Sequence, residues 1–201
     1  MANMRRPASA ALQAAQTWKR ELPQAIEPNR YILQILLALN RVEEAGQALT
    51  TSIHDLPAAE QNGAIASVPR IFSPLQDKKR AADVVEKALQ RAIAQADTAA
   101  SAWTTIGRMR RDAGQENLAI EAALKARQAD KAAPGPIILG LSLMGSDNPK
   151  LQAMLDDAMQ GTVLPELRLG YARTLISQQQ YPKALHELTR LNTKHPDFAE
   201  G

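Results

Sequence analysis

Apolar residues along this chain recur with helical spacing, in helix-length segments separated by short polar turns. Three segments share an alanine that stands twelve residues before a proline, at Ala11, Ala45 and Ala184. The step from Ala11 to Ala45 is 34 residues (45 − 11). A period of this length, filled by two short helices, predicts an array of helix pairs stacked on one another.

The segment that begins at Trp103 shows the same pattern in more detail. It combines two large apolar residues, a small residue, a turn glycine and two alanines, namely Trp103, Ile106, Gly107, Gly114, Ala119 and Ala126. Antiparallel helices come close only where one of them offers Gly or Ala, and a bulky residue of the other helix fills the hollow beside it. We therefore expect all of these residues except the turn glycine to be buried between helices.

These positions resemble the tetratricopeptide repeat (TPR), a family of two-helix repeats. Looser versions of the pattern occupy residues 26–57 and 165–196. The chain departs from the pattern at Arg168, where a large apolar residue is expected, and at Leu33, where a small one is. The resemblance implies an all-α, right-handed α-solenoid of antiparallel helix pairs that binds other proteins and catalyses no reaction.

The pattern predicts about eleven helices in a single solenoid domain over residues 1–201, and no segment alternates long enough to predict a strand. The predicted units are a half repeat at 8–23 and repeats at approximately 26–57, 62–97, 100–133, 134–161 and 165–196. The predicted helices are 8–21, 29–39, 43–55, 58–73, 78–95, 99–113, 116–129, 135–144, 149–159, 165–178 and 182–194.

One predicted helix contains residues that disfavour helical structure. Gly63 and Pro69 both lie inside the segment 58–73. A proline in the middle of a helix removes a hydrogen bond and costs about 3 kcal/mol unless the helix kinks. The sequence therefore predicts a bend or break near Pro69.

The two ends suggest a piece of a longer array, because the first helix lacks a repeat partner and Ala199 would begin a new repeat. Apolar strips are then expected to be uncovered, from Leu12, Ala15 and Trp18 at one end and from Leu185, Leu188 and Leu191 at the other. Such strips predict possible self-association through the ends. The start of the chain has no apolar signal-peptide region, and no direct membrane insertion is expected.

Composition narrows the function. The chain is 45% hydrophobic but only 3% aromatic, which suits close packing of small residues between helices. It has 24 Lys and Arg against 21 Asp and Glu, and no cysteine. Its histidines, His54, His186 and His195, are far apart, and no catalytic, nucleotide-binding or metal-binding motif is present. We expect no enzyme activity, no cofactor, no metal and no nucleic acid; a helical-repeat RNA-binding protein remains the alternative.

The TPR resemblance also implies which side chains line the concave face. Arginine recurs at one inward position, at Arg70, Arg108 and Arg173. The neighbouring inward candidates are Arg30, Gln34, Thr104 and Arg111, with Leu169 and Ile176 as apolar companions. Arginine forks suit carboxylates, so the expected ligand is an acidic or C-terminal peptide segment. The alternative is that these arginines are only solvated surface; the asparagine and lysine pattern of carboxylate-clamp TPRs is absent.

The segments 12–18, 32–41 and 169–175 resemble long, Ala-rich TPR scaffold proteins of proteobacteria. This resemblance implies a scaffold or adaptor whose partner is another protein or peptide, such as an envelope protease or another periplasmic protein. It also implies a location in the bacterial periplasm or at the outer membrane, with the cytoplasm as the alternative.

Overall fold

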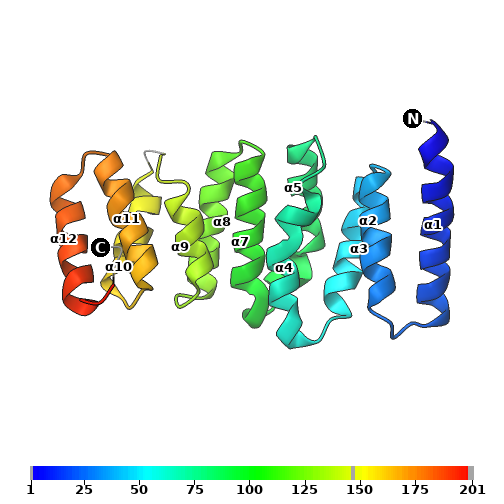
Figure 1. Cartoon of the computed structure of the whole chain (residues 1–201), viewed down its shortest axis with the longest axis horizontal. Helices are drawn as coiled ribbons and strands as arrows, with labels where there is room; N and C mark the ends of the chain where they lie inside the picture. Colours follow the sequence, from blue (N-terminus) through cyan, green and yellow to red (C-terminus); the bar gives the residue numbers. More distant parts are fainter. Residues whose placement is uncertain (1, 146–147, 199–201) are drawn as a thin grey trace.

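The computed structural model describes residues 2–145 and 148–198, which form twelve helices and no strand. The helices follow one another in a single row from α1 to α12 (Figure 1), which is the all-α helical-repeat architecture that the sequence predicted. Their bounds are α1 Ala2–Glu21, α2 Glu27–Ala38, α3 Val42–His54, α4 Ala58–Phe72, α5 Lys78–Ala88, α6 Gln90–Ile93, α7 Ala96–Asp112, α8 Glu116–Ala129, α9 Pro134–Leu141, α10 Pro149–Gln160, α11 Pro165–Ser177 and α12 Tyr181–Lys194. None of the described helices is both long and apolar enough to cross a membrane.

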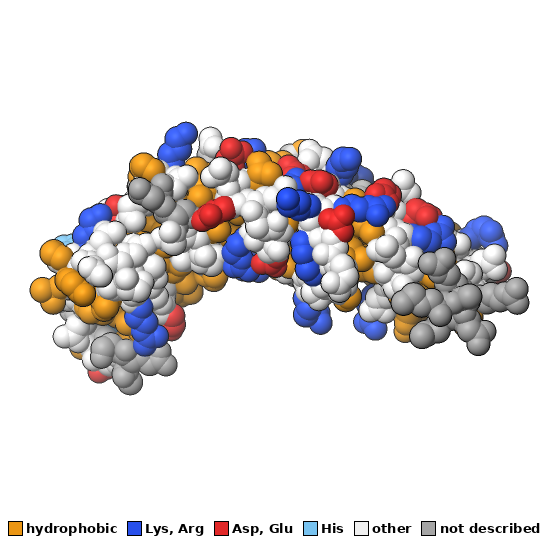
Figure 2. Space-filling view, turned by 90° about the horizontal axis from the view of Figure 1, so that it is seen from above, with side chains coloured by type: hydrophobic (Ala, Val, Ile, Leu, Met, Phe, Trp, Pro, Cys, Tyr) orange, Lys and Arg blue, Asp and Glu red, His pale blue; other side chains and the backbone are white. Residues whose placement is uncertain are grey.

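The row of helices curves into an arch with one hollow side and one bulging side (Figure 2). In Figure 1, α4 and α7 lie in front of α5 and α8, so that they face the hollow side of the arch. Figure 2 also shows several Lys and Arg side chains projecting into the hollow. The hollow side of the arch is therefore built largely by the first helices of the pairs.

Small residues occupy the closest helix contacts. Ala45, Ala102 and Ala119 have no exposed surface. A side chain at Gly107 in α7 would overlap the end of the buried Leu139 side chain of α9, so a larger residue there requires Leu139 to move. Ile106 and Ala126 are buried as expected, but Trp103 is only half-buried, with the Lys125 ammonium 4.4 Å from its ring centre.

The predicted helix 78–95 is interrupted, so that the chain has twelve described helices where about eleven were expected. Helix α5 ends at Ala88, and α6 begins after Leu89. At this point the hydroxyl of Thr50 in α3 lies 3.1 Å from the carbonyl oxygen of Ala88. A neighbouring helix thus supplies a hydrogen bond where the regular helix is interrupted. The interruption could not be predicted from residues 78–95, because the donor, Thr50, lies outside that segment.

The break predicted near Pro69 does not occur, because α4 runs continuously from Ala58 to Phe72. Proline lacks the N–H that would bond to the carbonyl of Ile65 four residues earlier. That carbonyl instead accepts a hydrogen bond from Thr105 in α7. The neighbouring helix thus compensates for the local defect.

Burial at the two ends differs from the uncovered strips that the sequence predicted. Leu12 and Ala15 are buried, and α1 packs on α2; Leu191 is buried as well. Leu188 is half-buried, while Trp18 and Leu185 are 39% and 67% exposed. The predicted exposure was wrong for Leu12, Ala15 and Leu191, which are buried. Self-association through the ends stays a prediction.

A polar cluster attaches α1 to the first full helix pair. The Lys19 ammonium donates to Asp55 at 2.7 Å and to the carbonyl oxygen of Pro23 at 2.8 Å. The buried Asn29 amide also donates to Asp55, at 2.9 Å. These hydrogen bonds, led by that from Lys19, hold the pKa of the Asp55 carboxyl below its ordinary value.

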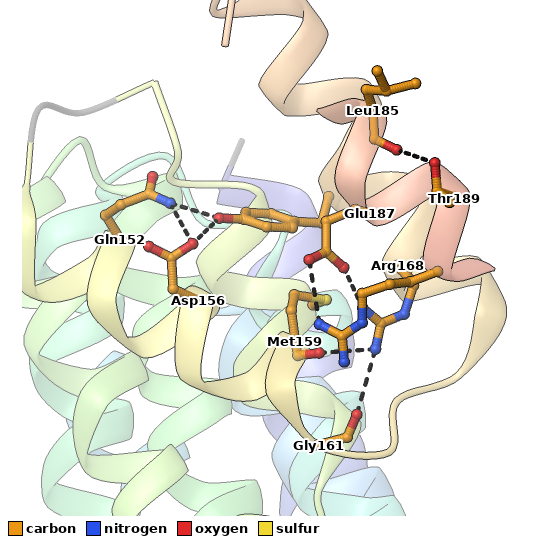
Figure 3. Close-up of polar contacts among 10 residues, drawn as sticks. Gln152, Asp156, Met159, Gly161, Arg168, Leu185, Glu187 and Thr189 are labelled. Carbon is orange, nitrogen blue, oxygen red and sulfur yellow. Dashed lines mark hydrogen bonds and ion pairs between the residues drawn. The ribbon is translucent and has the colours of Figure 1, made fainter. Parts of the chain in front are cut away.

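The arginine that departs from the repeat pattern is buried in an ion pair. Arg168 of α11 is 3% exposed and pairs with Glu187 of α12, which is 5% exposed (Figure 3). The same guanidinium donates to the carbonyl oxygen of Met159 at 2.9 Å and, more weakly, to that of Gly161 at 3.4 Å. One side chain therefore ties together the end of α10, the turn after it and the last helix pair.

A second polar cluster joins α10 to α11. The Tyr171 hydroxyl donates to Asp156 at 2.5 Å and accepts a hydrogen bond from the Gln152 amide at 2.6 Å. Burial, followed by the bond to Asp156, raises the pKa of Tyr171 above its ordinary value. The phenol is therefore neutral and serves as a fixed donor between the two helices.

Candidate partner-binding face

The larger of two hollows that predicted site residues line lies between α2 and α4, and we call it the α2/α4 groove. Its volume is about 660 Å³, within the range of roughly 300–1,000 Å³ typical of ligand sites. Its lining residues are Arg30, Leu33, Gln34, Leu37, Ala38, Ser67, Arg70, Ile71 and Pro74. The sequence predicted three of these, Arg30, Gln34 and Arg70, and the structure brings them together.

The α2/α4 groove combines an apolar lining with two cations. Leu37 and Ile71 are half-buried, and Ala38 is exposed, so part of the apolar lining remains open to solvent. Arg30 on α2 and Arg70 on α4 are both exposed. The described lining contains no carboxylate, so its local charge is positive.

Arg30 is held by an aromatic side chain and not by an acid. Its guanidinium lies 5.7 Å from the centre of the Tyr31 ring, a cation–π distance. Tyr31 in turn lies beside Trp18 of α1, with 6.1 Å between ring centres. Within the described ranges, neither Arg30 nor Arg70 forms an ion pair, so the N–H donors of both guanidinium groups are not engaged by a carboxylate of the fold.

A smaller hollow lies farther along the same row of helices, and we call it the α7 hollow. Its volume is about 220 Å³. It is lined by Asn62, Ala66, Asp97, Ala100, Ser101, Thr104, Thr105, Arg108, Asp130, Ala133, Gly135 and Pro136. Two predicted residues, Thr104 and Arg108, thus share a hollow, and the carboxylates Asp97 and Asp130 lie in the same lining.

Thr104 has mainly a structural role in this hollow. It is 6% exposed, and its hydroxyl donates to the Ala100 carbonyl oxygen at 2.7 Å. A side chain at Gly135 would begin 3.2 Å from Thr104, so the first turn of α9 packs closely against it. Little of Thr104 is left for a partner, whereas Arg108 is partly exposed and forms no ion pair with any described residue.

The remaining predicted residues do not join either hollow. Arg111 pairs with Asp112 at 2.9 Å and donates to the Ser142 hydroxyl at 2.9 Å. Arg173 and Ile176 are exposed on α11 and line neither hollow. Leu169 is 5% exposed, so its assignment to an open binding surface was wrong.

Most of the other described arginines are engaged by carboxylates, whereas Arg20, Arg91 and Arg173 form no ion pair with a described residue. Arg80 pairs with Glu43 at 2.5 Å, and Arg110 pairs with Asp83 at 2.6 Å. A guanidinium that already holds a carboxylate has fewer N–H groups left for a ligand. Arg30, Arg70 and Arg108 hold no such carboxylate, and they line the two hollows.

The sequence reasoning missed the apolar part of the α2/α4 groove. Leu37 and Ala38 follow Gln34 by three and four residues, and Pro74 follows Arg70 by four. Residues at these spacings share a helix face, or continue it just past the helix end. The helical spacing around Gln34 and Arg70 could therefore have identified these groove residues.

The described residues contain no group of three or more His, Cys, Asp or Glu side chains that could hold a metal ion. His54 belongs to α3 and His186 to α12, at distant points of the row, while His195 follows the last helix.

No protein-family description matches the chain, and no curated protein matches it. Among solved structures, BtubC (BKLC) from P. vanneervenii is 12% identical, with 93% of this chain and 87% of that chain covered and a TM-score of 0.50. YrrB, described as a TPR protein with an unusual peptide-binding site, is 19% identical over 94% and 96% of the two chains, with a TM-score of 0.47. PilF of Pseudomonas aeruginosa is 9% identical over 96% and 94%, with a TM-score of 0.45. The chain has a TPR-like helical-repeat fold.

Proposed function

We propose that this protein is a non-catalytic scaffold or adaptor that binds a partner protein or peptide on the hollow side of its arch. The observation that carries the proposal is the set of arginines there, Arg30, Arg70 and Arg108, which form no ion pair with the described residues. Most other described arginines are engaged within the fold. Unpaired guanidinium groups along one face supply donors for carboxylates of a partner.

The binding is expected to be modest in affinity and sensitive to salt. Both hollows are open to water, and charges exposed to solvent are screened over about 10 Å at 0.1 M salt. Each contact with an exposed arginine therefore contributes little alone, and recognition depends on several contacts made together.

RNA is the competing ligand, because arginine also pairs with phosphate. One feature favours a protein partner. The α2/α4 groove has no aromatic side chain in its lining on which a base could stack.

The test uses peptides selected on the immobilised protein from a random peptide library, with their affinities measured for matched variants. Arg70→Gln/Arg108→Gln removes two positive charges from the hollow side. Arg20→Gln/Arg91→Gln removes two from exposed arginines that line neither hollow. Because both variants lower the net charge equally, a difference between them reports position.

We expect the hollow-side variant to weaken binding roughly ten-fold, with little change in the control. Equal affinities for both variants, or an equal loss in both, would place the peptide elsewhere and overturn the proposal. A fluorescent oligouridine that binds more tightly than any selected peptide, and is lost in the hollow-side variant, would favour the RNA-binding alternative.

A further inference from the structure

We propose that the α2/α4 groove binds an extended partner segment that carries acidic side chains next to apolar ones. This inference rests on the proposed function, since it names the ligand for one part of the same hollow side. It is argued from the lining of the groove, in which apolar surface, two guanidinium groups and one unengaged amide lie together.

The apolar part of the lining calls for apolar side chains in the ligand. Leu37 and Ile71 are only half-buried, and Ala38 and Pro74 are exposed, so the groove has apolar surface that is still in contact with water. Covering such surface with Leu, Ile or Val side chains removes it from water, which favours binding. A purely polar acidic segment would leave this contribution unused.

The charged part of the lining calls for carboxylates. Arg30 and Arg70 come from different helices, and no acidic residue lines the groove between them. A carboxylate can accept two parallel hydrogen bonds from one guanidinium, which adds geometric selectivity to the attraction. A segment with basic side chains would instead meet two like charges without a compensating acid.

The amide of Gln34 suits the backbone of an extended segment. Gln34 is exposed and has no hydrogen-bond partner in the described part of the chain. Its carbonyl and NH2 groups can pair with the N–H and C=O of a peptide that has no internal helical bonds. The side chains that flank this contact would then reach the arginines or the apolar lining.

The α7 hollow does not offer the same chemistry. It contains Arg108, but Asp97 and Asp130 also line it, so an acidic segment there would meet two like charges. Its volume of about 220 Å³ is also a third of that of the α2/α4 groove. The acidic and apolar segment is therefore assigned to the α2/α4 groove alone.

Three labelled peptides of equal length test the proposed ligand chemistry by fluorescence anisotropy. The first interleaves Glu and Leu, the second replaces each Leu with Ser, and the third replaces each Glu with Lys. We expect the Glu/Leu peptide to bind most tightly to the full chain, with each of the other two at least about ten-fold weaker. Its affinity should fall between 0.05 and 0.5 M salt, as the Debye length shortens.

Two pairs of variants locate the peptide. Gln34→Glu places a carboxylate inside the groove, and Gln47→Glu places one on the exposed surface of α3, outside the groove. Arg30→Gln/Arg70→Gln neutralises the groove, and Arg20→Gln/Arg91→Gln is its charge-matched control. We expect roughly ten-fold weaker binding of the Glu/Leu peptide in each groove variant and less than about two-fold change in each control.

The outcomes separate this inference from the broader proposal. If the Glu/Leu peptide binds no better than the other two, or loses no affinity in the groove variants, the inference is overturned. If library-selected peptides still lose affinity in Arg70→Gln/Arg108→Gln, the scaffold function stands and only the ligand chemistry is wrong. All the substituted side chains are exposed except the partly exposed Arg108, so we expect every variant to fold. Unfolding curves for each variant show whether a loss of binding comes from a loss of fold.

Discussion

The hydroxyl of Thr105 in α7 donates to the backbone carbonyl of Ile65 in α4, at 3.0 Å and within a buried interface. The residue that would normally donate to this carbonyl within α4 is Pro69, which has no N–H. One hydrogen bond between helices therefore replaces one that is missing within a helix. This explains why α4 continues through Pro69, and it makes the contact between α4 and α7 specific.

Replacing Thr105 with valine should destabilise the fold. Valine has nearly the same shape but no donor, so the carbonyl of Ile65 would be left buried and unpaired. We expect the free energy of unfolding to fall by about 1–3 kcal/mol. Urea unfolding followed by circular dichroism measures this loss, and a midpoint equal to that of the unsubstituted protein would contradict the compensation described above.

The same substitution should cost less when residue 69 can donate. In Pro69→Ala the backbone N–H returns and can bond to the carbonyl of Ile65 within α4. We therefore expect Thr105→Val to destabilise the Pro69→Ala background less than the native one. A double-mutant cycle measures the difference, and strictly additive effects would show that the two positions are independent.

Two glycines should respond in opposite directions to an added side chain. Gly107→Leu would force α7 away from Leu139 and lower the free energy of unfolding by about 1–3 kcal/mol. Gly63 lies inside α4 with no atom within 4 Å of an added Cβ, so Gly63→Ala should raise it by about 0.5–1 kcal/mol. Melting temperatures that shift in the same direction for Gly107→Leu and Gly63→Ala would contradict the close packing at Gly107 and the open space at Gly63.

Breaking the buried pair of Arg168 and Glu187 should be strongly destabilising. Glu187→Gln leaves the Arg168 guanidinium buried without its counter-charge, at a cost of about 3–5 kcal/mol. The double substitution Arg168→Met/Glu187→Leu removes both charges together and should be less damaging than Glu187→Gln. Unfolding curves in guanidinium chloride for the two variants provide the comparison. A larger loss of stability in the double variant would mean that the hydrogen bonds to Met159 and Gly161 outweigh the ion pair.

Acid should weaken the attachment of α1 through Asp55. Because the folded pKa of Asp55 lies below its unfolded value of about 3.9, its contribution to stability is present above that pH. The contribution is lost as the pH falls through the folded pKa. The unsubstituted protein should therefore lose more stability than Asp55→Asn between pH 6 and pH 3. Melting temperatures at both pH values test this, and parallel curves for the two proteins would show that the carboxylate is not stabilising.

The binding surface was partly accessible from the sequence. Repeat positions identified Arg30, Gln34 and Arg70, which the structure gathers in one groove. The same reasoning placed Leu169 on that surface although it is buried. A repeat position gives only an approximate direction along a helix, and small changes of rotation between irregular repeats decide whether a side chain faces solvent or a neighbour.

The sequence by itself determined the helical-repeat architecture, because helix propensity, apolar spacing and the placement of small residues act within one repeat or between adjacent repeats. Only the tertiary structure decided how the exceptions are accommodated. Pro69 and Arg168 are both unfavourable by the local pattern. Thr105, which bonds to the Ile65 carbonyl that Pro69 leaves without a donor, lies 40 residues from Ile65, and Glu187 lies 19 residues from Arg168 (187 − 168). Hydrogen bonds and ion pairs depend on the distance between atoms, and that distance is set by the packing of helices and cannot be read from local spacing.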